Sequence, residues 1–122
     1  FDGGTIINRQ SAIQQMRGGM YMGLSLASSE TFVFDDSGIV LNPDLRNYQM
    51  LRLGEQPKTY LVDFVETPAI DGPYGAGGIG EYGVIGMSSA LANALSNVAR
   101  VELNELPLIP ERIWEMKWGQ KR

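Results

Sequence analysis

The stretch GPYGAGGIGEYGVIG, residues 72–86, guides the interpretation of this chain. It holds seven of the fifteen glycines, and residues 88–99 behind it have the apolar spacing of a helix. Because glycine has no side chain, such a loop lets another molecule or segment approach its backbone closely. Glu81 stands just ahead of the helical segment, where free N–H groups favour negative charge. We therefore interpret Glu81 as a candidate catalytic residue.

The composition indicates one globular domain spanning residues 1–122, with 43% apolar and 20% charged residues. No apolar run approaches the roughly 20 residues that a membrane span needs, and no secretory signal opens the chain. We expect a cytoplasmic protein, and a secreted protein without disulfides fits the absence of cysteine equally. The net charge of −4 argues against nucleic acid as a partner, because phosphate binding needs a basic surface.

The chain contains neither cysteine nor histidine. This excludes disulfides, iron–sulfur ligation, ordinary structural zinc and a Ser-His-Asp triad within these residues. Catalysis must therefore rest on carboxylates, on other oxygen or nitrogen side chains, on backbone donors, or on a cofactor that they hold.

Apolar residues recur at spacings of three and four over residues 12–28, which predicts a helix whose capping residue is Ser11. Three glycines interrupt this helix: Gly18, Gly19 and Gly23. Each glycine costs a helix roughly 1 kcal/mol relative to alanine. Two explanations stay open. Either the glycines pack closely against a sheet and leave Gln15 at the surface, or a ligand lies on the bare face and hydrogen-bonds Gln15.

The rest of the chain alternates short β-type runs with helical patterns. The expected strands and hairpin arms are residues 5–7, 31–34, 39–41, 60–66 and 101–106. An apolar stripe indicates a second helix, with Leu91, Ala94, Leu95 and Val98 on its packed face. Pro110 opens a third, since proline suits the first helical position. This order predicts a two-layer α+β fold, a small mixed β-sheet with helices packed on one side.

Spacing alone offers two interpretations of the glycine-rich run. Residues 75–80 match G-x-G-x-x-G, and Glu102 follows about twenty residues later, as in a dinucleotide-binding site. That motif leaves a strand at once, however, whereas Pro68 and Pro73 separate the expected strand from the glycines. The second interpretation is a structural turn in which Glu81 only stabilises a helix start, by roughly 0.3–1 kcal/mol. Spacing by itself favours the second interpretation.

Five motifs occur in order along nearly the whole chain. They are DGGTIIN at 2–8, QMRGG at 15–19, ETP at 66–68, GAGGIGEYGVIG followed by ALANA within 75–94, and ELPLIPER at 105–112. Together they resemble the carboxyl-terminal part of the molybdenum hydroxylases, the xanthine dehydrogenase, aldehyde oxidase and carbon monoxide dehydrogenase large subunits. Five ordered motifs are far more specific than any one of them.

The resemblance implies part of a molybdopterin-binding subunit of an oxidoreductase that hydroxylates aldehydes or nitrogen heterocycles. The family residue that matches Glu81 is the active-site base beside molybdenum, and the one that matches Gln15 contacts the pterin. Gly77, Gly78 and Gly80 are then expected at the cofactor. The pterin, with or without an attached cytosine nucleotide, would hold the metal, so no protein metal ligand is expected here. Iron–sulfur and FAD centres would lie on other domains or subunits.

Four positions depart from the family motifs. Gly77 stands where lysine is common, Arg9 where proline stands, Gln14 where glycine is usual and Arg17 where glutamate is frequent. None of these changes removes the expected base.

The chain begins at Phe1 without methionine, and we expect it to be the carboxyl-terminal fragment of a larger subunit. Such a fragment would be inactive and free of cofactor, and it would self-associate through surfaces that the remainder of the subunit covers. Two alternatives remain open. One is a free-standing module that binds a phosphate or a dinucleotide through the glycine loop, and the other is a catalytically inactive homologue that acts as a scaffold.

Overall fold

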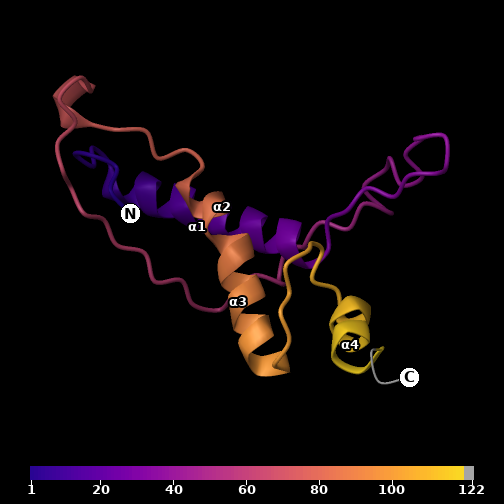
Figure 1. The fold of residues 1–122 in the computed structure, drawn as a ribbon. Coiled ribbons are helices and arrows are strands. Elements are labelled where there is room, and N and C mark those ends of the chain that lie inside the picture. Colours follow the sequence, from indigo (N-terminus) through magenta and orange to yellow (C-terminus); the bar gives the residue numbers. More distant parts are fainter. Residues whose placement is uncertain (120–122) are drawn as a thin grey trace.

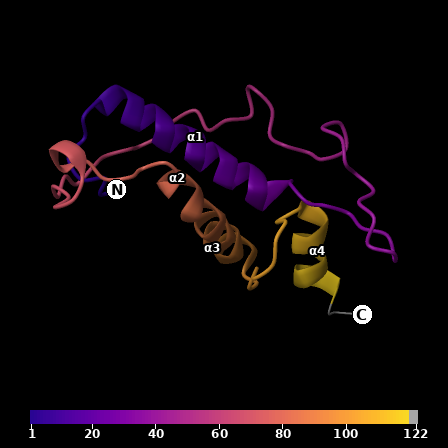
Figure 2. The ribbon, with the colours of Figure 1, turned by 90° about the horizontal axis from the view of Figure 1, so that it is seen from above.

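The computed structural model describes residues 1–119 and shows helices joined by long irregular segments (Figure 1). Within this range the helices are α1 (Arg9–Ser28), α2 (Tyr82–Ile85), α3 (Met87–Ala99) and α4 (Pro110–Trp118), with a 3-10 turn η1 (Pro73–Gly75). The amino-terminus and α4 lie at opposite sides of the molecule (Figures 1 and 2). No helix in this range is long and apolar enough to span a membrane.

The predicted α+β fold with a small mixed sheet is wrong. Across residues 1–119 the β-type pairing consists of isolated bridges, which join Asp2 to Val65, Gly4 to Ala76 and Phe34 to Val40. A strand is stable only when several strands share an apolar face. The run 60–66 has no such neighbours, and Leu61 is 89% exposed. Residues 60–66 therefore form an extended segment and not a strand of a sheet.

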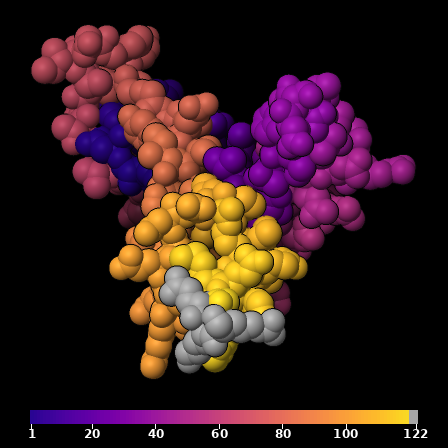
Figure 3. Space-filling model, turned by 45° about the vertical axis from the view of Figure 1, so that its right-hand side comes forward, coloured from indigo at the N-terminus to yellow at the C-terminus, as the bar shows by residue number. Residues whose placement is uncertain are grey.

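The hairpin predicted over residues 31–41 is present as a turn with one antiparallel bridge. The Leu41 N–H donates to the Val33 carbonyl at 2.7 Å, and Asp35 Oδ1 accepts the N–H groups of Ser37 and Ile39. In the space-filling view this magenta part of the chain stands out as a lobe (Figure 3).

Helix α1 begins three residues earlier than predicted. Asn8, in an extended conformation, caps it, and its Oδ1 accepts the Ser11 N–H at 3.0 Å. Asparagine caps a helix as well as serine does, so the cap that comes first along the chain sets the start. Ser11, the predicted cap, consequently lies within the first turn.

Close packing explains two of the glycines in α1. A Cβ at Gly19 would lie 3.1 Å from the Gly83 Cα, and one at Gly23 would lie 2.8 Å from the Val84 carbonyl oxygen. The two backbones touch because neither side carries a side chain, and Figure 2 shows α2 against the middle of α1. The glycines thus pack closely, as one of the two explanations expected, but the predicted partner is wrong, because they pack against a helix and not a sheet. Gly18, by contrast, faces open space.

A small apolar core joins the end of α1 to α3 and to the segment before α4. The Leu108 N–H donates to the Ala27 carbonyl at 2.7 Å, and Ala27, Leu103 and Leu108 are buried together. The predicted stripe of α3 is correct only in part, since Leu91 and Leu95 pack here while Val98 is 81% exposed. Helix α4 begins at Pro110 as predicted.

The substitution Gly83→Ala should destabilise the fold. Its Cβ would lie 2.5 Å from the Met16 carbonyl oxygen, which belongs to rigid helix backbone. Overpacking of this kind costs about 1–3 kcal/mol, measured as a lower thermal midpoint of the purified protein. Gly86→Ala is the matched control, because the site has open space and helical dihedral angles. The control should be neutral or slightly stabilising, and equal losses in the two variants would contradict the packing account.

Candidate functional site

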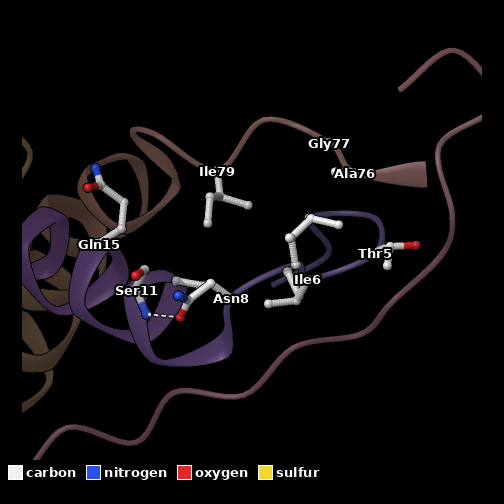
Figure 4. A pocket seen from close by; sticks show the side chains of 11 residues that line it. Thr5, Ile6, Asn8, Ser11, Gln15, Ala76, Gly77 and Ile79 are labelled. Carbon is white, nitrogen blue, oxygen red and sulfur yellow. Dashed lines mark hydrogen bonds between the residues drawn. The ribbon is translucent and has the colours of Figure 1, made fainter. Parts of the chain in front are cut away.

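A pocket of about 300 Å³ lies between the amino-terminal segment, the first turns of α1 and the glycine-rich loop (Figure 4). Its lining residues are Gly3, Thr5, Ile6, Ile7, Asn8, Ser11, Ala12, Gln15, Ala76, Gly77 and Ile79. Three motifs that lie far apart in the sequence therefore meet at one hollow. We refer to it as the loop pocket.

Backbone hydrogen bonds join the two walls of the loop pocket. The Thr5 N–H donates to the Gly75 carbonyl, and the Gly77 N–H donates to the Gly3 carbonyl, each at 2.8 Å. Gly75 has a positive φ of 77°, which glycine adopts without strain. The amino-terminal motif is thus paired directly with the first half of the glycine-rich loop.

A carboxylate fixes the amino-terminal wall. Asp2 Oδ1 accepts the N–H of Gly4 at 3.1 Å and that of Thr67 at 3.2 Å. Hydrogen bonding from Thr67, first through its side chain and then through its backbone, lowers the pKa of Asp2 below its usual 3.8, and the Gly4 N–H adds to this. Because the pKa is lowered, the contribution of these hydrogen bonds to folding stability is present above pH 3.8. It is lost as the pH falls through the lowered pKa of Asp2.

Gln15 connects α1 with the second half of the glycine-rich loop. Its Nε2 donates to the Gly80 carbonyl oxygen at 2.5 Å, and the side chain also lines the loop pocket. The structure therefore brings Gln15, Gly77 and Gly80 together, although 62 residues separate the first two along the chain. Sequence reasoning proposed each of them, but it gave no signal for the direct contact.

Glu81 follows Gly80 and is exposed. Its side chain makes no hydrogen bond or ion pair with residues 1–119, and it does not line the loop pocket itself. The helix that it precedes, α2, has only four residues, so the macrodipole argument for its placement is weaker than the sequence suggested. The carboxylate stands free beside a residue that Gln15 holds in place.

The glycines of residues 72–86 fall into two groups. Four of them are needed as glycine by the packing of this chain, because a Cβ would lie 3.0 Å or less from a neighbouring atom: Gly72, Gly75, Gly77 and Gly83. The other three would meet nothing within 4 Å and have no positive φ: Gly78, Gly80 and Gly86. Gly77 thus has a structural reason to lack a side chain, whereas residues 1–119 supply none for Gly78 or Gly80.

Sequence reasoning missed the groups that anchor the amino-terminal wall. Glu66 Oε2 accepts the Ile6 N–H at 3.0 Å, and Arg9 contacts both Asp63 and Glu66. The ETP motif at 66–68 marked this place, but a motif match gave its glutamate no role. The bridge between residues 2 and 65 and the Val65 N–H bond to the Phe1 carbonyl place the two segments side by side, which the sequence pattern did not indicate.

Comparisons with known proteins show the family of the chain. Residues 1–57 match the model of the molybdopterin cofactor-binding domain. The xanthine dehydrogenase molybdenum-binding subunit of Escherichia coli O157:H7 is 36% identical over 93% of this chain and 15% of its own length. The aldehyde oxidoreductase molybdenum-binding subunit of E. coli K12 is 32% identical over 90% of this chain and 15% of its own length.

A solved structure gives the same result. Quinoline 2-oxidoreductase from Pseudomonas putida 86 superposes with a TM-score of 0.87 at 28% identity, over 99% of this chain and 15% of that protein. The fold and these similarities therefore define a molybdopterin cofactor-binding segment. The chain belongs to the xanthine dehydrogenase and aldehyde oxidase family of molybdenum-binding subunits. It spans about 15% of the length of the curated relatives that it matches.

Proposed function

We propose that the intact protein is a molybdenum hydroxylase and that this segment forms one wall of its cofactor site. The observation that carries the proposal is the bare backbone of Gly78 and Gly80. Gln15 donates a hydrogen bond to the Gly80 carbonyl, and Glu81 is the next residue of the chain. The relatives act, by their names, on an aldehyde, on xanthine or on quinoline. We therefore propose aldehydes or nitrogen heterocycles as the substrate class.

The open glycines fit a bound pterin. A Cβ at Gly78 or Gly80 would meet no atom of this chain, so neither internal packing nor backbone conformation calls for glycine there. A planar ring system that approaches the backbone does call for it, since a side chain would hold the ring away. The loop offers this bare surface next to an amide and a carboxylate, which are suitable partners for a polar heterocycle.

Gln15 is the residue that we propose to contact the pterin. One N–H of its amide is engaged by the Gly80 carbonyl. A second N–H and the carbonyl oxygen remain, and these match the donor and acceptor edge of a pterin. The hydrogen bond to Gly80 also fixes the side chain before the cofactor binds, so less side-chain entropy is lost on binding.

Glu81 is the residue that we propose as the base. The bound cofactor supplies the two-electron oxidation of the substrate carbon, and the protein supplies binding and proton transfer. Water would supply the oxygen, and Glu81 would accept one of the two protons that are released while the cofactor takes up the electron pair. Its carboxylate is suited to the role because no group in residues 1–119 occupies its oxygens. General-base catalysis by a positioned carboxylate contributes about 10²–10⁴-fold.

The remainder of the subunit is the partner that we propose for the exposed apolar residues. Large side chains such as Leu61, Ile70, Phe34 and Trp114 are exposed, which is costly unless another surface covers them. We propose that the cofactor is a molybdopterin, with or without an attached cytosine nucleotide, that iron–sulfur and FAD centres lie on further domains or subunits, and that the protein is cytoplasmic. We also propose that the isolated segment is inactive and self-associates.

The alternative of a free-standing dinucleotide-binding module is not favoured. Its glycine motif needs a strand before the loop and a full helix after it. Here residues 60–66 form no strand, and α2 has four residues. The scaffold alternative differs from an enzyme only in activity, so the Glu81 variant below decides between them.

Gln15→Ala in the intact protein should speed cofactor release. A lost neutral hydrogen bond costs about 1 kcal/mol, which corresponds to roughly fivefold in the dissociation rate of the pterin. Gln14→Ala is the matched control, because the Gln14 side chain is exposed and makes no hydrogen bond within residues 1–119. Equal release rates in wild type and in both variants would return Gln15 to the role of a surface residue.

Glu81→Gln in the intact protein should abolish turnover and leave the cofactor bound. Glutamine keeps the shape of the side chain but cannot accept the proton, so the rate should fall by about 10²–10⁴-fold. Molybdenum content and pterin absorbance, measured on the same sample, check that the site is loaded. A fully loaded variant that turns over within about fivefold of wild type, well below the general-base range, would make Glu81 structural.

A further inference from the structure

We propose that Arg9 is a positioning residue for the loop pocket. It acts through the carboxylates of Asp63 and Glu66, which lie beside the amino-terminal wall. The inference rests on the proposed function, because it assigns Arg9 a role toward the same bound pterin. Arg9 is the first residue of α1 and directly follows the capping residue Asn8.

Arg9 binds the segment that passes beside the start of α1. Its Nη2 lies 2.5 Å from Asp63 Oδ1, and its Nη1 lies 3.8 Å from Glu66 Oε1. The guanidinium also stands over the Phe64 ring, 5.6 Å from the centroid. The Phe64 N–H and then Arg9 lower the pKa of Asp63, so this carboxylate stays charged at neutral pH. One side chain thus contacts three residues of the segment.

Glu66 passes this restraint to the pocket. Its Oε2 accepts the Ile6 N–H at 3.0 Å, while its Oε1 faces Arg9. Ile6 lines the loop pocket, and so does Asn8, which caps α1 immediately before Arg9 (Figure 4). The arginine is consequently linked to the wall twice, through the helix start and through Glu66.

The other hydrogen bonds that hold this wall within residues 1–119 involve its first five residues, including those that join Gly3 and Thr5 to the glycine-rich loop. Asp2 fixes Gly4 and Thr67, and the Val65 N–H donates to the Phe1 carbonyl at 2.7 Å. Residues 6–8, which approach Gln15, depend on the Glu66 carboxylate and on the Asn8 cap. Removing the arginine charge should therefore loosen the part of the wall that lies nearest to the proposed pterin contact.

The effect should be moderate and sensitive to salt. Arg9 is 52% exposed and Asp63 is 85% exposed, so water and ions screen their attraction. Exposed ion pairs of this kind change an equilibrium by a factor of about two to five. Such a change is too small to unfold the protein, which makes the variant informative about the pocket.

The test uses the intact protein and four variants: Arg9→Gln, Arg9→Lys, Asp63→Asn and Arg112→Gln. Hydrogen exchange at the Ile6 amide and the dissociation rate of the pterin are measured at low and at 1 M salt. Arg112→Gln is the matched control, because it removes the Arg112–Glu105 ion pair, which lies outside the loop pocket. The Ile6 readout does not depend on activity.

At low salt, Arg9→Gln and Asp63→Asn should each speed Ile6 exchange and pterin dissociation by about two- to fivefold. Arg9→Lys should return both rates, Ile6 exchange and pterin dissociation, most of the way to the wild-type values. At 1 M salt the variants should no longer differ from wild type. Arg112→Gln should change neither rate. Unchanged Ile6 exchange in Arg9→Gln would overturn the proposal.

Faster Ile6 exchange with an unaltered pterin dissociation rate would also overturn it, because Arg9 would then be structural only. An intact protein that binds no molybdopterin would refute the proposed function, and with it any role of Arg9 toward a cofactor. The Ile6 exchange rates would still report on the contact between Arg9 and the wall, so the two failures are distinguishable.

Discussion

The arrangement of the site depends on the contact between the backbones of α1 and α2. Gly83 lies so close to the carbonyl of Met16 that no side chain fits there, and Gly19 is bare on the opposite side. Because α2 follows the glycine-rich loop directly, this contact also sets where the loop ends. Gln15, one turn before Gly19, can then reach the Gly80 carbonyl, and Glu81 emerges beside it.

The glycine-rich loop divides into a structural half and an open half. Its first half folds back on itself and pairs with the amino-terminal segment, where Gly75 accepts two N–H groups, those of Thr5 and Ala69. Its second half, Gly78 to Gly80, touches nothing that would forbid a side chain. The first half thus builds the pocket wall, and the second half presents bare backbone beside the two residues with the clearest chemistry.

The sequence predicted the helices better than the strands, for a physical reason. Helix α4 begins at Pro110 and α1 ends at Ser28 as expected, since caps and periodicity act within a few residues. The run 60–66 has a strand-like pattern, but a sheet needs partner strands that residues 1–119 do not supply. Motif resemblance selected Gln15 and Glu81. The hydrogen bond that places Gln15 next to Glu81, and the division of the glycines into packed and open ones, could be seen only in the structure.

The central claim is that Gly78 and Gly80 are bare because a cofactor lies against them. A structure of the intact protein with its cofactor bound tests this most directly. The account predicts pterin atoms within about 4 Å of the backbone of both glycines, with the Gln15 amide on the pterin and the Glu81 carboxylate facing the molybdenum. A structure in which polypeptide covers the two glycines and the cofactor lies elsewhere would contradict the account.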